Sequence, residues 1–112
     1  MKTTGDQQLV KRINRSVLLR LLRRRGSLSR AQLASESGLT KSTVSLLVRE
    51  LIDEGFVVET ELAPAQGLGR PSTPLRLDGS RRAMVGAEIA VETLRVVGVS
   101  LVGEVLWSAE EA

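Results

Sequence analysis

Residues 29–55, which read SRAQLASESGLTKSTVSLLVRELIDEG, decide the fold. Ser29 and Gln32 have the spacing of a capping box, in which two side chains accept hydrogen bonds from the free backbone N–H groups at a helix start. Thr40 is of the type that caps a second helix, and Gly38 just before it is a residue at which helices end. The stretch therefore predicts two helices joined by a tight turn with a central glycine.

Helical periodicity extends this pattern toward both ends of the chain. A helix is predicted from about Gln7 to Arg25, because its apolar residues recur at spacings of three and four. The next two helices are predicted over residues 29–37 and 40–54, and the last of them ends at Gly55. A short helix rich in small residues, followed by a four-residue turn and a second helix, is the helix-turn-helix arrangement.

The period changes from 3.6 to 2 after the third helix, which predicts strands. One strand is expected over residues 56–62 and a returning strand over residues 73–77, with a Gly- and Pro-rich loop between them. Pro74 lacks a backbone N–H, so this second strand is expected at a sheet edge. Three helices followed by a β-hairpin describe an α+β winged helix-turn-helix domain, which we expect over residues 1–78.

Residues 79–112 differ from the rest of the chain and predict a second, incomplete domain. Val-rich runs at 83–89, 94–101 and 104–107 are typical of three antiparallel strands in a β-meander. No helical pattern follows that would cover this sheet. Its bare edges and apolar faces are expected to favour pairing with another copy of the chain.

Charge and composition narrow the classes of function. Residues 1–82 hold 15 Lys and Arg against 8 Asp and Glu, whereas residues 83–112 hold 1 against 5. A basic front suggests an anionic partner such as nucleic acid, and a merely solvated Arg-rich surface is the alternative. The chain has no Cys and no His, so we expect no catalytic residue, metal or cofactor. No apolar run approaches the ~18 residues that span a bilayer, so the expectation is a cytoplasmic protein without a membrane partner.

The third predicted helix has a polar face opposite its apolar one. If Val44, Leu47, Val48 and Leu51 face the core, the opposite face is centred on Ser42, Leu46 and Arg49. The first turns of such a helix enter the major groove of double-stranded DNA, where Arg reads guanine and an apolar side chain contacts a thymine methyl. The candidate base contacts are Lys41, Ser42, Thr43, Ser45, Leu46 and Arg49, and the candidate contacts to the DNA backbone are Arg30 and Thr40.

The loop between the predicted wing strands contains Gly69-Arg70-Pro71. A glycine and a proline that hold Arg70 in extended backbone would let it enter a narrow, electronegative minor groove. The alternative is a turn shaped by Gly69 and Pro71, with a solvated Arg70. We favour insertion into the minor groove, because the loop forms the tip of a DNA-binding wing.

The order and spacing of several short motifs resemble the amino-terminal part of the ROK family, which comprises repressors, open reading frames and sugar kinases. The motifs are Asn14-Arg15, then GSLSRAQLA at 26–34, GLTKSTVS at 38–45, LIDEG at 51–55 and Gly69-Arg70-Pro71. The resemblance is to the xylose-repressor-like and N-acetylglucosamine-repressor-like regulators. It implies a cytoplasmic, bacterial, DNA-binding repressor of carbohydrate-metabolism genes that acts as a homodimer.

The strands after residue 83 resemble the start of the family's actin-like sugar-kinase domain. Kinase members carry there an Asp-x-Gly-Gly-Thr phosphate loop, whereas this chain has Glu88-Ile-Ala-Val-Glu92. Larger side chains replace both glycines, and an acidic residue replaces the threonine, so phosphate would be repelled. The departure favours a repressor, with the sugar effector bound only in a longer form. The alternatives are a fragment of a ROK sugar kinase and a winged helix used for protein–protein contact.

Overall fold

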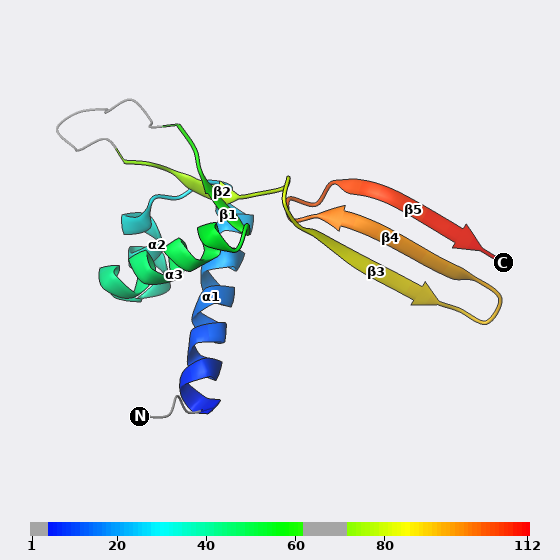
Figure 1. Ribbon diagram of the computed structural model, residues 1–112, viewed down its shortest axis with the longest axis horizontal. Coiled ribbons are helices and arrows are strands. Elements are labelled where there is room, and N and C mark those ends of the chain that lie inside the picture. The colour runs from blue at the N-terminus through cyan, green and yellow to red at the C-terminus, as the bar shows by residue number, and fades with distance from the viewer. Residues whose placement is uncertain (1–4, 62–71) are drawn as a thin grey trace. The chain divides into compact units, whose positions relative to one another are not determined.

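The computed structural model describes residues 5–61 and 72–112, and they form two compact units, Met1–Leu77 and Asp78–Ala112 (Figure 1). In chain order the elements are α1 (Gly5–Arg25), α2 (Arg30–Ser37), α3 (Lys41–Asp53), β1 (Val57–Glu59), β2 (Leu75–Leu77), β3 (Ala83–Ile89), β4 (Leu94–Ser100) and β5 (Val105–Glu111). The sequence placed the boundary one residue later. Asp78 is the first residue of the second unit, and its Oδ1 atom accepts hydrogen bonds from the N–H and hydroxyl groups of Ser80 at 2.9 and 2.6 Å.

The caps predicted from the sequence are present at both short helices. Ser29 Oγ accepts from the N–H of Gln32 at 3.1 Å, and Gln32 Oε1 accepts in return from the N–H of Ser29 at 2.8 Å. Gly38 has φ 77°, a left-handed conformation that glycine adopts without steric cost, and its N–H closes the last turn of α2 on Ala34. Thr40 then caps α3. The turn between the helices is therefore fixed by local hydrogen bonds.

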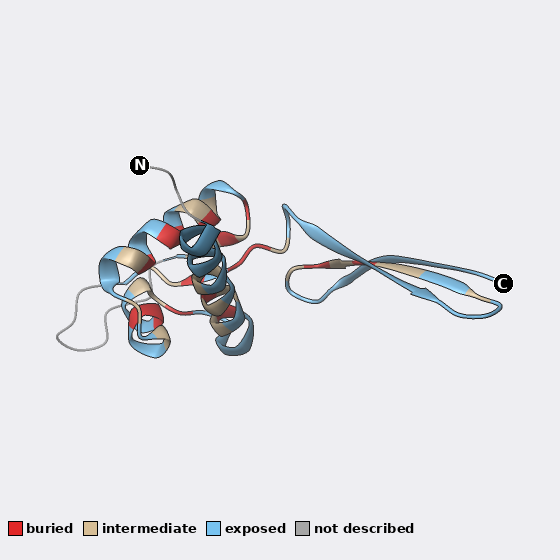
Figure 2. Ribbon diagram, turned by 90° about the horizontal axis from the view of Figure 1, so that it is seen from below, coloured by how far each residue is buried: buried red, intermediate tan, exposed pale blue. Residues whose placement is uncertain are grey.

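The first unit has one hydrophobic core, which lies where the three helices meet the short sheet (Figure 2). All three helices and both strands contribute to it, as does the linker residue Leu28. Its buried members are Leu18, Leu22, Leu28, Leu33, Ala34, Val44, Leu47, Val48, Leu51, Val57, Leu75 and Leu77. Because α3 buries the apolar face that the sequence predicted, its opposite face is left exposed.

The two strands of the wing hairpin are shorter than the sequence predicted. β1 and β2 pair antiparallel over three residues each, with Val57 opposite Leu77. The returning strand is an edge strand of this two-stranded sheet, as predicted, and Leu75 alone also forms an isolated bridge with Leu28 on its other side, through backbone hydrogen bonds of 2.8 and 3.1 Å. Pro74 lies just before β2, so its missing N–H interrupts no ladder, and its carbonyl accepts from the N–H of Thr60 at 2.9 Å.

The second unit is an antiparallel sheet in the order β3-β4-β5, as the sequence predicted. β5 runs to Glu111, four residues further than expected from its composition, because pairing with β4 continues to Leu94. A β-bulge interrupts the pairing between Gly98 and Val99. Gly98 has a packing role, since a Cβ atom there would lie 2.4 Å from Nε1 of Trp107 on the neighbouring strand.

The two faces of this sheet differ in chemistry. Side chains alternate between the faces, so the register places one set of apolar residues together. This apolar face consists of Ala83, Val85, Ala87, Ile89, Leu94, Val96, Gly98, Trp107 and Ala109, with the polar residues Ser100 and Glu111 at its two ends. The opposite face carries a charged row of Glu88, Arg95 and Glu110, with Arg95 and Glu110 3.4 Å apart. Most of the sheet is exposed (Figure 2), including Val85 at 67% and Ile89 at 84%.

Candidate nucleic-acid interface

Helix α3 presents a continuous exposed face of polar and basic residues. Six predicted site residues lie on this helix, and five of them are exposed: Lys41, Ser42, Ser45, Leu46 and Arg49. Leu46 is 58% exposed, although it is the one large apolar side chain among them. Across the helix lie Val44, Leu47 and Val48, all buried. We define these five exposed residues as the reading face of α3.

Thr43 differs from the rest of the predicted set, because it is only half-exposed and is held by the cap. Thr40 Oγ1 accepts from the N–H of Thr43 at 3.2 Å and donates to the Thr43 hydroxyl at 2.8 Å. Ser42 Oγ lies 3.2 Å from the same Thr40 oxygen. These hydroxyls form a cluster at the N-terminus of α3, where the free N–H groups and the helix dipole favour an anion such as phosphate.

Arg30, a predicted contact to the DNA backbone, is held by the base of the wing. Its Nη2 atom lies 2.7 Å from Oε1 of Glu59 on β1. The pair borders a hollow of about 350 Å³ whose lining also includes Ser45, Arg49 and Asp53. Arg49 is exposed and forms no ion pair with any described residue, so its guanidinium is available to a ligand.

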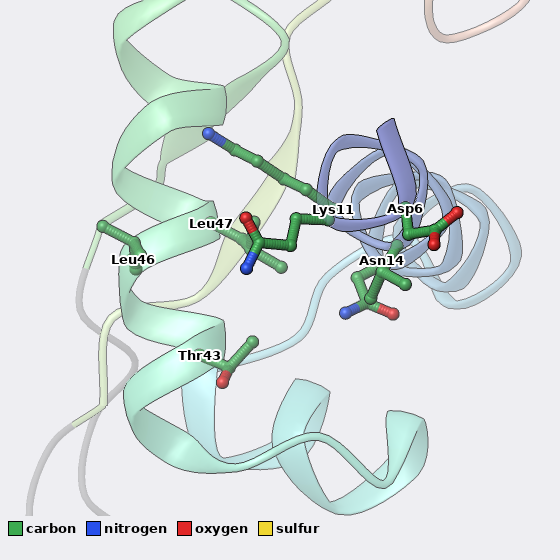
Figure 3. A pocket seen from close by; sticks show the side chains of 8 residues that line it. Asp6, Lys11, Asn14, Thr43, Leu46 and Leu47 are labelled. Atoms are coloured by element: carbon green, nitrogen blue, oxygen red, sulfur yellow. The ribbon is translucent and has the colours of Figure 1, made fainter. Parts of the chain in front are cut away.

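Two ion pairs connect α1 to α3 and to Glu54, the residue at the C-terminal cap of α3. Lys11 Nζ lies 2.6 Å from Oε1 of Glu50, and Arg15 lies 2.8 Å from Oε2 of Glu54. Figure 3 shows the Lys11 side chain reaching from α1 across to α3. The Arg15 guanidinium also lies 5.8 Å from the ring centre of Phe56, within the range of a cation–π contact. These contacts connect α1 to the C-terminal part of α3 and to the residues that follow it.

Lys11, Arg15, Glu50 and Glu54, which form these two ion pairs, were not predicted from the sequence, and neither was Glu59. The sequence does contain a signal for the two ion pairs. Two basic residues four apart on one helix match two acidic residues four apart on another, so each pair lies on a single helix face. Glu59 gave no such signal, because its partner Arg30 is 29 residues away and only the folded hairpin brings them together.

Gly69-Arg70-Pro71, the predicted contact to the minor groove, lies outside the described residues. Within residues 5–61 and 72–112, no group of three or more His, Cys, Asp or Glu side chains is arranged to hold a metal ion. None of the helices in those ranges is both long enough and apolar enough to cross a membrane.

Comparison with known proteins defines the class. A winged helix-turn-helix DNA-binding family matches residues 11–58, which hold most of α1, all of α2 and α3, and the start of β1. The match covers the reading face and the two ion pairs between Lys11 and Glu50 and between Arg15 and Glu54. The first unit is therefore a winged helix-turn-helix domain of the DNA-binding class.

Several named proteins are similar in sequence to this chain over a range that extends beyond the first unit. A putative xylose repressor from Caldicellulosiruptor sp. (strain Rt8B.4) is 32% identical over 108 residues, which are 96% of this chain and 27% of the relative. The xylose repressor of Bacillus subtilis (strain 168) is 32% identical over 102 residues, 91% of this chain and 26% of the relative. The N-acetylglucosamine repressor of Escherichia coli O157:H7 is 33% identical over 63 residues, 56% of this chain and 16% of the relative.

A solved structure agrees with these relatives. The crystal structure of a ROK family transcriptional regulator, a homolog of the E. coli MLC protein, has a TM-score of 0.72 and 29% identity, and covers 90% of this chain and 26% of that chain. The chain is similar to the amino-terminal part of ROK family transcriptional regulators. It spans about a quarter of the length of the xylose repressors that it matches.

Proposed function

We propose that the chain is the operator-binding part of a transcriptional repressor that controls sugar uptake or metabolism genes. The observation that carries this proposal is the reading face of α3, with Lys41, Leu46 and Arg49 exposed on a helix whose other side is the core. A helix of this kind enters the major groove, where Arg49 donates to guanine and Leu46 packs on a thymine methyl. Double-stranded DNA is the ligand, and the cytoplasm is the place of action.

The basic side chains around the reading face supply attraction to phosphate that does not depend on base sequence. Lys41 stands in the first turn of α3, beside the hydroxyl cluster that Thr40 organises. Arg30 forms an ion pair with Glu59, so its guanidinium has to leave the Glu59 carboxylate before it contacts a DNA phosphate. Phosphate contacts fix register and make binding salt-dependent, whereas base contacts select the site.

The relatives' names support the regulatory role and suggest the inducer class. Proteins named xylose repressor and N-acetylglucosamine repressor match this chain, so we propose a sugar as the effector of the longer protein. The second unit is then the first part of the effector-binding domain, and the longer protein acts as a homodimer. This chain itself supplies the DNA-binding part.

The turn between β3 and β4 supports a repressor over a sugar kinase. Ala90 donates its N–H to the carbonyl of Thr93 at 2.8 Å and closes a short turn that contains Val91 and Glu92. Val91 is fully exposed, and Glu92 adds a negative charge. A phosphate loop needs glycines that bring backbone N–H groups close to the anion, and these side chains oppose that approach.

Selection from a random duplex library tests the proposed function. The full chain is expected to enrich one sequence motif, and the enriched duplex should bind more tightly than a shuffled duplex of the same composition. Binding to both should weaken as salt rises, and their difference should persist. Equal affinity for the enriched and shuffled duplexes would reduce the role to nonspecific binding, and no binding at low salt would favour the protein–protein alternative.

A further inference from the structure

Helix α1 and the reading face of α3 share a hollow of about 450 Å³ (Figure 3). Its lining includes Asp6, Lys11 and Asn14 from α1, and Thr43 and Leu46 from α3. Leu46 belongs to the reading face, and Thr43 belongs to the hydroxyl cluster at the start of α3. The hollow therefore adjoins the proposed DNA-binding surface on the side of α1.

The reading face has a wall on each of its two flanks. On one flank, Ser45 and Arg49 border the hollow that they share with Arg30 and Glu59 at the base of the wing. On the other flank, Leu46 borders the hollow shared with α1. The major groove is about 12 Å wide, and a helix with its side chains is about 10–12 Å across, so a helix in the groove lies close to both sugar–phosphate strands. One strand then faces the base of the wing, and the other faces α1.

Asn14 is the residue of α1 best suited to contact a phosphate of the strand that faces this helix. Its side chain lines the hollow, is half-buried, and forms no hydrogen bond with any residue within 5–61 and 72–112. The side-chain amide of Asn offers two N–H donors, and such amides are among the groups that contact phosphate oxygens in DNA complexes. A partly confined side chain also loses less conformational entropy when it binds.

The charges around the hollow favour Asn14 as the point of contact. Lys11 lies 2.6 Å from Glu50, so its positive charge is already paired. Asp6 lies eight residues before Asn14, about 12 Å along the helix axis, and its carboxylate repels phosphate at that end of the hollow. On the α3 side, the free N–H groups of the first helical turn, beside Thr43, favour an anion.

We propose that the Asn14 amide donates a hydrogen bond to a phosphate of the DNA strand that faces α1, so that α1 forms the second wall of the DNA-binding site. This inference rests on the proposed function, because it requires α3 to lie in the major groove. Phosphate contacts carry no base information. Asn14 therefore fixes the position of α3 in the groove and strengthens binding to every duplex by a similar factor.

Two aspartate substitutions on α1 test the contact in the full chain. Asn14→Asp keeps the shape of the side chain but places a carboxylate against the phosphate, so affinity for the enriched and the shuffled duplex should fall about tenfold. Ser16→Asp is the matched control: it adds the same charge at an exposed position two residues further on, about 160° around the helix. Fluorescence anisotropy at fixed salt should show a much smaller loss for this variant.

Equal losses in the two variants would assign the effect to net charge and overturn the contact, and so would an unchanged affinity of Asn14→Asp. Circular dichroism and urea unfolding check that both variants remain folded. Asn14→Ala, which removes the donors without adding a charge, is the second variant and should weaken binding to both duplexes by a smaller factor.

Neutral phosphates locate the contact on the DNA. A set of enriched duplexes carries one methylphosphonate each, which removes the charge of a single phosphate. At one position on the strand that faces α1, the substitution should weaken binding of the unmodified chain, and this loss should be much smaller for Asn14→Ala, because the two changes remove the same interaction. Ser16→Ala should keep the full loss.

Identical methylphosphonate profiles for Asn14→Ala and the unmodified chain would overturn the inference even if the chain binds DNA as proposed. Failure of the unmodified chain to bind any duplex would instead remove the proposed function. The two results are distinguishable because the first requires a measurable affinity of the unmodified chain for the enriched duplex.

Discussion

Arg30, the first residue of α2, donates from Nη2 to Oε1 of Glu59, the last residue of β1, at 2.7 Å. This ion pair connects the start of the helix-turn-helix to the base of the wing, and it places a carboxylate beside the proposed DNA-binding surface. Side chains of both residues are partly exposed, at 35% and 48%, so the pair contributes little to folding stability. The main effect of this ion pair is to reduce the positive charge at the surface that DNA would contact.

Replacement of Glu59 by Gln is therefore expected to strengthen DNA binding. The substitution removes a negative charge near phosphate and releases Arg30 from its partner, so affinity for specific and shuffled duplexes should rise by similar factors. Fluorescence anisotropy at two salt concentrations measures the change. Glu104→Gln in the second unit is the control for net charge, and an equal rise in that variant would show that Glu59 has no local role.

Arg49→Ala is expected to cost about 1–3 kcal/mol of binding free energy on the enriched duplex, and to relax preference at one base position. Arg49 is available because no described residue pairs with it. Arg12→Ala removes the same charge from α1 and serves as the control at fixed salt. A loss that is equal on enriched and shuffled duplexes would make Arg49 a phosphate contact.

Thr40→Ala is expected to destabilise the folded chain by ~1 kcal/mol, because the hydroxyl caps α3 and orders Thr43. Urea unfolding measures the change in the free energy of unfolding. Ser45→Ala, a hydroxyl removed from an exposed position in the middle of α3, should change stability by much less. Equal losses from the two variants would mean that the cap is not what stabilises this helix.

The helices and the reading face of α3 could be predicted because their signals are local. Capping residues, glycine stops and an apolar period of 3.6 are properties of neighbouring residues, and the caps at Ser29 and Thr40 are confirmed. Leu28 could not be predicted as a partner of Leu75, because that pairing depends on how the helices bring a linker beside a strand. Ion pairs such as Lys11–Glu50 likewise need the tertiary arrangement.

The last strand illustrates the same limit. Its sequence after Trp107 has low strand propensity, yet Ser108 to Glu111 continue as β5. Pairing with Leu94–Val97 of β4 supplies the hydrogen bonds that the residues' own preferences do not favour. Strand propensity has little influence at the end of a strand, so hydrogen bonding to a strand that is already formed outweighs it.

The apolar face of the second unit is expected to make the 112-residue chain associate. Val85, Ile89 and Trp107 lie on that face and are at least 48% exposed, whereas the opposite face carries the charged row with Arg95 and Glu110. Burial of this surface against another copy removes apolar area from water. Sedimentation velocity at micromolar concentrations should show species larger than a monomer, and a deletion that ends at Arg82 should lose this mode of association.

A pair of lysine substitutions identifies the face responsible. Val85→Lys puts a charge on the apolar face and should reduce the sedimenting mass, while Ser108→Lys puts the same charge on the opposite face and should leave it unchanged. Both positions are exposed, so neither substitution creates a buried charge within the sheet. If both lysine variants dissociate equally, the strand edges rather than the apolar face hold the copies together.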